Sequence, residues 1–234
     1  MSDLRAVLFD VDFTIAKPGP DLGPEGYQRL GRRYGLELDP SRYEDARRLA
    51  FEELERHPEL EHDEEIWVVF TERIIRAMGE GGERAYECAV EMTRAWEHAH
   101  NFDIYDDVLP TFAALREHGL RIGLVSNTAR DLDTFVRHHA LDVDAALSSR
   151  VHGRVKPHAS IFRAVLERLD VDAGAAAMVG DTPEDDVEGA RALGMRALLL
   201  DRENRFPDVE GRLDDLRELP AALGLSSARS SRTS

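Results

Sequence analysis

Lysine is scarce in this chain, whereas arginine is plentiful. Of the 30 lysine and arginine residues, only Lys17 and Lys156 are lysines. Basic residues as a whole are outnumbered by 46 acidic ones, which gives a formal net charge of −16. A chain of this charge is repelled by nucleic acids and by anionic membranes, so we expect neither as a partner.

Cysteine and long apolar runs are also in short supply. The single cysteine, Cys88, excludes an intramolecular disulfide, and its helical surroundings favour a position in the core. No apolar run approaches the ~20 residues that a membrane-spanning helix needs, and no signal-peptide pattern precedes the first predicted strand. We therefore expect a cytoplasmic protein. Its 234 residues suffice for one domain with an insertion or for two small domains.

Two patterns divide the chain. Residues from about 25 to 100 show no convincing strand, and the helices expected there are 26–34, 41–57, 64–78 and 83–100. After residue 108, expected helices at 108–118, 131–139, 157–169 and 183–193 alternate with strands at 121–125, 145–147, 176–179 and 196–200. Such alternation is typical of a parallel sheet with crossover helices. Gly119 and Gly194 are expected to end two of these helices.

A short apolar strand at 6–9 runs directly into Asp10, Asp12 and Thr14. Two carboxylates crowded at a strand end repel each other unless a cation or a proton lies between them. Strand ends are also where open α/β sheets carry their chemistry. By itself the motif is equally compatible with a polar loop after a buried strand, so the rest of the chain must decide.

Three later segments place polar residues at the ends of predicted elements. Ser126 and Asn127 follow the strand at 121–125, Lys156 stands before Pro157 at the start of a helix, and the acidic run 181–186 follows the strand at 176–179. In this order after the first motif, these segments resemble the haloacid dehalogenase (HAD) superfamily of phosphohydrolases. The resemblance covers nearly the whole chain and rests on four motifs in their structural context rather than on any one of them.

The resemblance implies an α/β fold with a three-layer, Rossmann-like parallel-sheet core. This core would comprise residues 1–16 and 105–225, and an all-helical cap, residues 17–104, would be inserted after the first motif. The last nine residues, 226–234, are rich in serine and arginine, and we expect them to be disordered.

The activity implied by the resemblance is Mg²⁺-dependent hydrolysis of a small phosphorylated metabolite through an aspartyl-phosphate. Asp10 would be the nucleophile, and Asp12 would act as general acid and then general base. An acid at position 12 favours phosphate esters, because members that cleave carbon–halogen or phosphonate bonds lack one there.

The remaining motif residues receive ligand-binding roles from the same resemblance. Hard oxygen ligands suit Mg²⁺, and they would be Asp10, the backbone carbonyl of Asp12, Asp181 and Asp186. The expected substrate-binding residues are Thr14, Ser126, Asn127 and Lys156. Lys156 also counts as catalytic, since a compact ammonium in an arginine-rich chain suggests a need to neutralise both Asp10 and the phosphoryl group.

Several positions stay open at this stage. Asp185 is either a metal ligand or, with Thr182, part of a helix-capping box. Phe13 replaces the glycine that is usual in the family, and its ring either turns away from the backbone or narrows the cleft. Lys17 either contacts an anionic part of the substrate or is a solvated loop residue. The same two choices, substrate contact or surface ion pair, apply to a group of cap arginines: Arg32, Arg33, Arg47 and Arg48.

Two alternatives to phosphatase activity also remain. A phosphomutase would use the same two aspartates and pass the phosphoryl group to a sugar instead of water. A catalytically idle regulatory protein on the same fold is the other alternative, although every chemical residue is present. The sequence fixes neither the substrate nor the oligomeric state.

Overall fold

A five-stranded parallel sheet forms the centre of the computed structural model, which describes residues 4–54, 57–79, 82–209 and 211–225. Its strand order is β5-β4-β1-β6-β7. The strands are β1 (Ala6–Phe9), β4 (Arg121–Ser126), β5 (Ala145–Ser148), β6 (Ala176–Gly180) and β7 (Arg196–Leu199). Phe9 of β1 is in register with Leu124 of β4 and Val179 of β6. The carboxyl ends of the three central strands therefore meet at one edge of the sheet.

Helices cover both faces of the sheet, as the sequence predicts. Val7 and Phe9 point to one face, where the Phe9 and Phe112 ring centroids are 5.0 Å apart. Phe112 belongs to α5 (Val108–Glu117). Ala6 and Leu8 point to the other face and belong to the same apolar cluster as α8 (Ala159–Leu169). Every side chain of β1 is buried, which explains why its sequence is a continuous apolar run. With helices on both faces of the parallel sheet, the expected three-layer α/β fold is confirmed.

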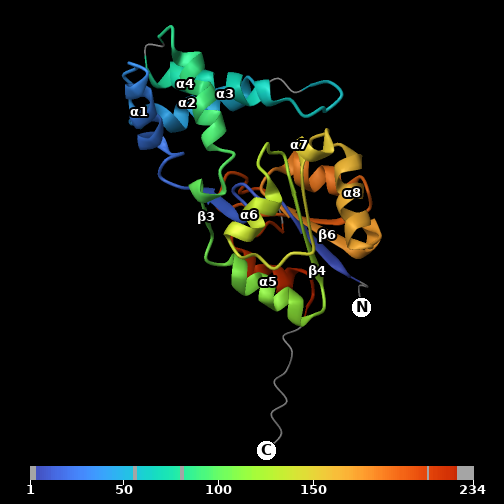
Figure 1. Ribbon diagram of the computed structural model, residues 1–234. Coiled ribbons are helices and arrows are strands. Elements are labelled where there is room, and N and C mark those ends of the chain that lie inside the picture. The colour runs from blue at the N-terminus through green and yellow to red at the C-terminus, as the bar shows by residue number, and fades with distance from the viewer. Residues whose placement is uncertain (1–3, 55–56, 80–81, 210, 226–234) are drawn as a thin grey trace, which may run out of the picture.

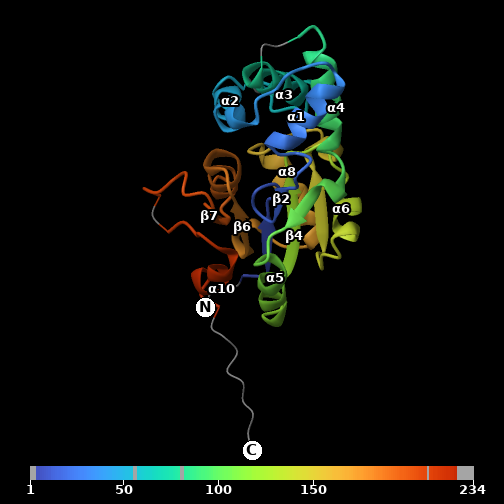
Figure 2. The same cartoon turned by 90° about the vertical axis from the view of Figure 1, so that its left-hand side faces the viewer.

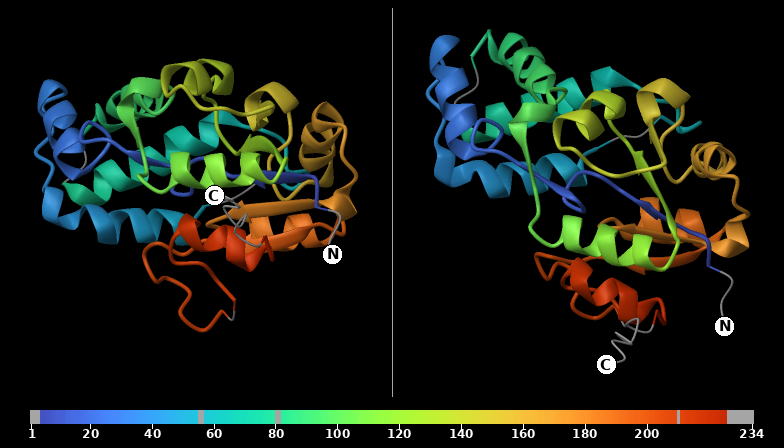
Figure 3. Two further views of the ribbon diagram at one scale, coloured as in Figure 1. Left: turned by 90° about the horizontal axis from the view of Figure 1, so that it is seen from below. Right: turned by 60° about the horizontal axis from the view of Figure 1, so that its bottom comes forward.

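Short elements complete this part of the chain. The helices are α6 (Leu132–His138), α7 (Ser149–His152), α9 (Gly189–Arg191) and α10 (Leu219–Ala222). Gly119 and Gly194 hold left-handed φ angles of 71° and 83° just after their helices, which confirms them as helix ends. The expected helix at 183–193 instead begins as a wide π-helical turn, Pro183–Glu188. Figure 2 shows α5 and α10 at the end of the molecule remote from α1 to α4, and in Figure 3 the red C-terminal segment packs beside α5.

Four further helices form a separate group above the sheet in Figure 1, called here the helical group. They are α1 (Pro24–Arg33), α2 (Tyr43–Glu52), α3 (Glu64–Met78) and α4 (Ala85–Ala95). Cys88 is buried in α4, as expected. Two predicted helices were too long, since 41–57 shortens to α2 and 83–100 to α4. Pro58 disfavours helical backbone at the residue before it, although residues 55 and 56 lie outside the described chain.

Two strands that the sequence analysis did not anticipate connect the sheet to the helical group. β2 (Ala16–Pro18) pairs antiparallel with β3 (Phe102–Ile104), and Lys17 faces Asp103 in the register. The two connections are thus tied together where the chain leaves and re-enters the sheet region. The predicted tail at 226–234 lies outside the described residues. Within the described chain, no helix has the length and apolar character that a membrane crossing requires.

Candidate active site

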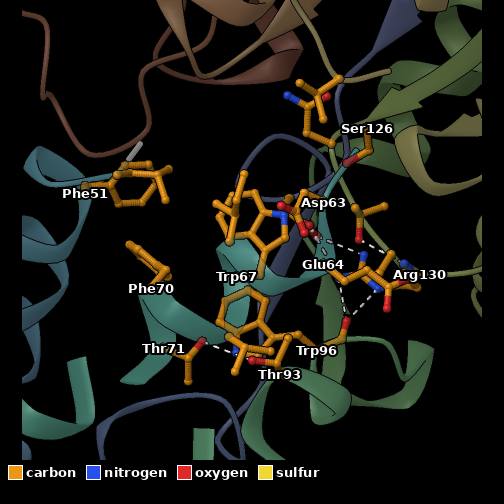
Figure 4. A pocket seen from close by; sticks show the side chains of 18 of the residues that line it. Phe51, Asp63, Glu64, Trp67, Phe70, Thr71, Thr93, Trp96, Ser126 and Arg130 are labelled. Atoms are coloured by element: carbon orange, nitrogen blue, oxygen red, sulfur yellow. Dashed lines mark hydrogen bonds and ion pairs between the residues drawn. The ribbon is translucent and has the colours of Figure 1, made fainter. Parts of the chain in front are cut away.

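A cavity of about 640 Å³ lies between the carboxyl edge of the sheet and the helical group. Its lining includes the ends of all three central strands: Asp10 and Asp12 after β1, Ser126 at the end of β4 and Asp181 after β6. The opposite wall comes from α2, α3 and α4. Figure 4 shows these two sides, with Ser126 and Arg130 facing a set of aromatic side chains.

Three buried carboxylates converge below this cavity. Oxygen atoms of Asp10, Asp181 and Asp186 all lie within 4.8 Å of one another. Asp186 reaches the cluster from the π-helical turn because Gly180 has no side chain. A Cβ at Gly180 would collide with the Asp186 carboxylate. The close approach of the turn to β6 therefore requires glycine at this position.

Lys156 lies inside the carboxylate cluster. Its Nζ is 2.5 Å from Oδ1 of Asp10 and 2.6 Å from Oδ1 of Asp186, and the lysine is 2% exposed. Burial opposes the charge on the ammonium, but the attraction of Asp10 and Asp186 outweighs it and raises the pKa of Lys156. Lys156 therefore stays protonated between the two carboxylates.

The same crowding acts on the acids. Burial raises the pKa of Asp10 well above its ordinary value, Asp186 and Asp181 raise it further, and Lys156 offsets these effects in part. Burial and the neighbouring Asp186 raise the pKa of Asp181 to about 6, although Arg205 donates a 2.7 Å hydrogen bond to its Oδ2. Three buried oxygen donors so close together fit a hard divalent cation, which would remove their mutual repulsion.

Asn127 supports Lys156 through the backbone. Its Oδ1 accepts the Lys156 N–H at 2.6 Å, and its Nδ2 donates to the Lys156 carbonyl at 3.0 Å. These two bonds fix the start of the segment that carries the ammonium. Ser126 is buried and lines the cavity. Thr14 is fully buried, does not line the cavity among the described residues, and its hydroxyl has no hydrogen-bond partner there.

The capping-box interpretation of Asp185 was wrong. Asp186, not Asp185, accepts the backbone N–H of Thr182, at 3.0 Å, and the Thr182 side chain makes no capping bond. The wider π-helical turn brings residue 186, four positions on, back to the first N–H. Asp185 lines the cavity and accepts a 3.3 Å hydrogen bond from Asn127.

Arg130 and Arg205 are site residues that the sequence analysis missed. Arg130 is buried and binds Asp12, and Arg205 binds Asp181. Arginine is the ordinary basic residue of this chain, so neither position stood out by its residue type. The only available signal was that Arg130 follows Ser126 by four residues, within the loop after β4.

Phe13 is one of the residues that line the cavity. The residue adopts a φ of 63°, in the left-handed region that favours glycine. Its ring centroid lies 6.4 Å from that of Trp96, and the Arg47 guanidinium lies 5.4 Å from its centroid. The ring of Phe13 was expected either to turn away from the backbone or to narrow the cleft, and its place in the cavity lining supports the second possibility.

The surroundings of the cap arginines and of Lys17 distinguish surface residues from residues of the cavity. Arg33 pairs with Glu91 at 2.8 Å and Arg48 with Glu52 at 3.1 Å, which are surface ion pairs. Arg47, in contrast, lines the cavity. Lys17 is not among the described lining residues, and its Nζ lies 5.8 Å from the Tyr105 ring centroid.

Comparison with known proteins agrees with this fold. The family model for haloacid dehalogenase-like hydrolases matches residues 4–194. A phosphoserine phosphatase of Thermus thermophilus is 30% identical over 92% of this chain and 98% of its own length. A haloacid dehalogenase-like hydrolase domain-containing protein 3 of Danio rerio is 31% identical over 94% of this chain and 96% of its own length.

Solved structures give the same result. A HAD phosphatase from Thermococcus onnurineus is 26% identical, with a TM-score of 0.64 over 96% of this chain and all of that one. The Bacillus subtilis HAD-hydrolase YfnB superimposes with a TM-score of 0.72 over 94% of this chain and 98% of that one, at 19% identity, which establishes the fold.

The chain belongs to the haloacid dehalogenase-like hydrolase family. This confirms the family resemblance found in the motifs. The expected enzyme class, a HAD-like phosphoric monoester hydrolase, is confirmed at the level of the family and its phosphatase relatives.

Proposed function

We propose that this protein is a Mg²⁺-dependent phosphatase that hydrolyses a small phosphorylated metabolite through an aspartyl-phosphate on Asp10. The observation that carries the proposal is the buried cluster of Asp10, Lys156, Asp181 and Asp186 at the base of a cavity that Asp12 also lines. Relatives named phosphoserine phosphatase and glyceraldehyde 3-phosphate phosphatase support phosphate-ester chemistry.

In the first step, an Asp10 oxygen attacks phosphorus and the ester P–O bond breaks. Asp12 gives its proton to the departing oxygen, which leaves as an alcohol, and the phosphoryl group remains on Asp10. In the second step, water attacks phosphorus while Asp12 takes its proton, and cleavage of the P–O bond to Asp10 releases phosphate. Acid–base assistance of this kind contributes ~10²–10⁴ in rate.

Lys156 would hold Asp10 in place and offset the negative charge that gathers as the two anions approach. Asp10, Asp181, Asp186 and the Asp12 backbone carbonyl would hold the Mg²⁺ ion. When bound, the ion supplies positive charge to the carboxylates and to the phosphate oxygens.

Donor groups beside this cluster would bind the phosphate oxygens. Ser126 would supply its hydroxyl from the end of β4. Asn127, which already binds the Lys156 backbone twice, would act mainly by positioning that lysine. The predicted role of Thr14 remains a prediction.

The helical group fits the role of a cap, residues 17–104, that closes on the substrate and excludes bulk water. Both of its connections to the sheet pass through the β2–β3 pair, which would serve as the base of that movement. The cytoplasmic location expected from the sequence also remains a prediction.

Phosphate release from a panel of phosphorylated metabolites, measured with Mg²⁺ and with a chelator, tests the proposal. We expect Mg²⁺-dependent release that disappears in Asp10→Asn, with that variant still folded by circular dichroism. Release that survives exhaustive chelation, or that persists in Asp10→Asn, would overturn the mechanism. Isomerisation of a phosphosugar without phosphate release would identify a phosphomutase instead.

A further inference from the structure

We propose that the alcohol part of the substrate is apolar and carries no second anionic group, as in the phosphate monoester of an aromatic or long-chain alcohol. This inference rests on the proposed phosphatase activity and specifies its substrate class. It comes from the aromatic wall, a surface of the cavity formed by Phe13, Phe51, Trp67, Phe70 and Trp96.

Ring contacts join the members of the aromatic wall. The Phe70 ring meets Phe51 edge-on at a centroid distance of 5.1 Å and meets Trp67 edge-on at 5.8 Å. Phe13 and Trp96 form a second pair on the side of the carboxylates. Figure 4 shows Phe51, Phe70, Trp67 and Trp96 gathered opposite Ser126. An apolar surface thus extends from the phosphate site along the helical group.

Two members of the wall would gain contacts from an apolar ligand. Phe51 is 51% exposed at the edge of the cavity, although burial of a phenyl ring from water is favourable. Phe13 holds a left-handed backbone conformation that glycine adopts more easily, one residue after Asp12. An apolar substrate group would cover the first ring and contact the second, which gives both positions a function.

Charge around the cavity disfavours a second anion on the substrate. Among the described lining residues of the helical group and its loops, five are carboxylates: Glu61, Asp63, Glu64, Glu65 and Glu97. Two are arginines, Arg47 and Arg94, and Arg47 already pairs with Glu44 at 3.4 Å. Thr93, another lining residue, donates its hydroxyl hydrogen to Thr71 at 3.3 Å, so this donor is already used within the protein. Glu64 and Glu97 pair with Arg150, and Glu61 pairs with Arg154, so part of this negative charge is offset. The carboxylates still outnumber the arginines in this part of the lining and would repel an additional carboxylate or phosphate.

A series of n-alkyl phosphates from ethyl to octyl tests the inference, because the leaving groups are chemically alike and differ in apolar length. We expect kcat/KM to rise about two- to fourfold for each CH₂ group that becomes buried. Butyl phosphate should also be hydrolysed faster than phosphoserine or glycerol phosphate. A flat series, or faster hydrolysis of the anionic and hydroxylated esters, would overturn the substrate class while leaving the phosphatase proposal intact.

Binding provides a readout that does not need turnover. In calorimetric titrations with Mg²⁺, octylphosphonate should bind at least tenfold more tightly than ethylphosphonate, and Phe51→Ala should reduce that ratio. Leu49→Ala is the matched control, since Leu49 lies on the same helix, is 46% exposed and does not line the cavity. Equal binding of the two phosphonates would overturn the inference even in a protein with no measurable phosphatase activity, whereas absent turnover with length-dependent binding would overturn only the proposed function.

Discussion

Arg130 and Asp12 form a two-point ion pair that links the proposed general acid to the helical group. Nη1 of Arg130 lies 2.9 Å from Oδ1 of Asp12, and Nη2 lies 3.4 Å from Oδ2. The same guanidinium donates to the Trp96 carbonyl at 3.1 and 3.2 Å and lies 3.6 Å from the centroid of the Phe102 ring. Arg130 thus fixes the Asp12 carboxylate relative to the segment that follows α4.

We predict that Arg130→Lys lowers kcat by roughly 10- to 100-fold for alkyl phosphates, because a point charge cannot hold the carboxylate at two atoms. The loss should be smaller for p-nitrophenyl phosphate, whose leaving group needs no proton. Arg137→Lys, an exposed change on α6, is the control for loss of a guanidinium.

A double-mutant cycle decides whether Arg130 acts through Asp12. Arg130→Lys should cause little further loss in an Asp12→Asn background, because no carboxylate is then left for the guanidinium to position. Fully additive losses would contradict a positioning role. Melting temperatures of all four proteins show whether a change in stability accounts for the losses.

The two lysines offer a matched pair of substitutions. Lys156→Arg should lower kcat/KM by about 100-fold or more, because a planar guanidinium cannot take the place of an Nζ held 2.5 and 2.6 Å from two buried carboxylates. Lys17→Arg changes an exposed strand residue outside the described cavity lining and should leave kcat/KM within twofold. Steady-state kinetics on p-nitrophenyl phosphate would check both, and near-normal activity of Lys156→Arg would remove the need for a compact ammonium.

The raised pKa of Asp181 predicts that the stability of the folded protein depends on pH and on bound metal. Its pKa rises from an ordinary value of 3.8 to about 6 in the folded protein. The neutral carboxyl therefore stabilises the fold below about pH 4, and this contribution is lost as the pH rises through about 6. In EDTA at pH 7.5, Asp181→Asn should melt about 2–4 °C higher than the parent, with a smaller difference at pH 5.

With Mg²⁺ in place of EDTA, we expect the parent to melt at a higher temperature than Asp181→Asn. If Mg²⁺ binds the cluster as proposed, it should raise the melting temperature of the parent, whereas the asparagine variant should respond weakly. A variant that melts below the parent in EDTA at pH 7.5 would contradict the charge repulsion on which this prediction depends.

Long-range pairing explains what the sequence could not predict about the fold. β1, β4 and β6 are apolar runs with polar residues after them, so their identity and common edge followed from local patterns. β2 and β3 are three-residue strands far apart in the chain, and each is defined only by the other. Phe13 was likewise ambiguous, because its ring contacts Trp96 and Arg47, which lie far from it in the sequence.

In the site, too, local motifs predicted some residues, whereas contacts between distant parts of the chain could not be predicted. Asp10, Lys156, Asp181 and Asp186 were chosen from motifs, and the structure brings them together. The error at Asp185 arose because a capping box presupposes an ordinary helical first turn, whereas this turn is π-helical. The sequence could not predict the role of Arg130 from its place after Ser126 alone, because its contact with Asp12 spans 118 residues of the chain.

Gly180 offers a test of the carboxylate cluster that removes no charged group. An added Cβ would fall on the Asp186 carboxylate, so Gly180→Ala should push Asp186 away from Asp10 and Lys156. We expect a lower kcat and a severalfold higher Mg²⁺ concentration for half activity, with about 1–3 kcal/mol lost from the free energy of unfolding. Gly174→Ala is the control, because a Cβ there meets nothing within 4 Å, and the change should be neutral or stabilise by up to about 1 kcal/mol. Chemical denaturation and Mg²⁺ titrations of activity would compare the two variants. Unchanged Mg²⁺ dependence in Gly180→Ala would mean that Asp186 does not contribute to the metal site.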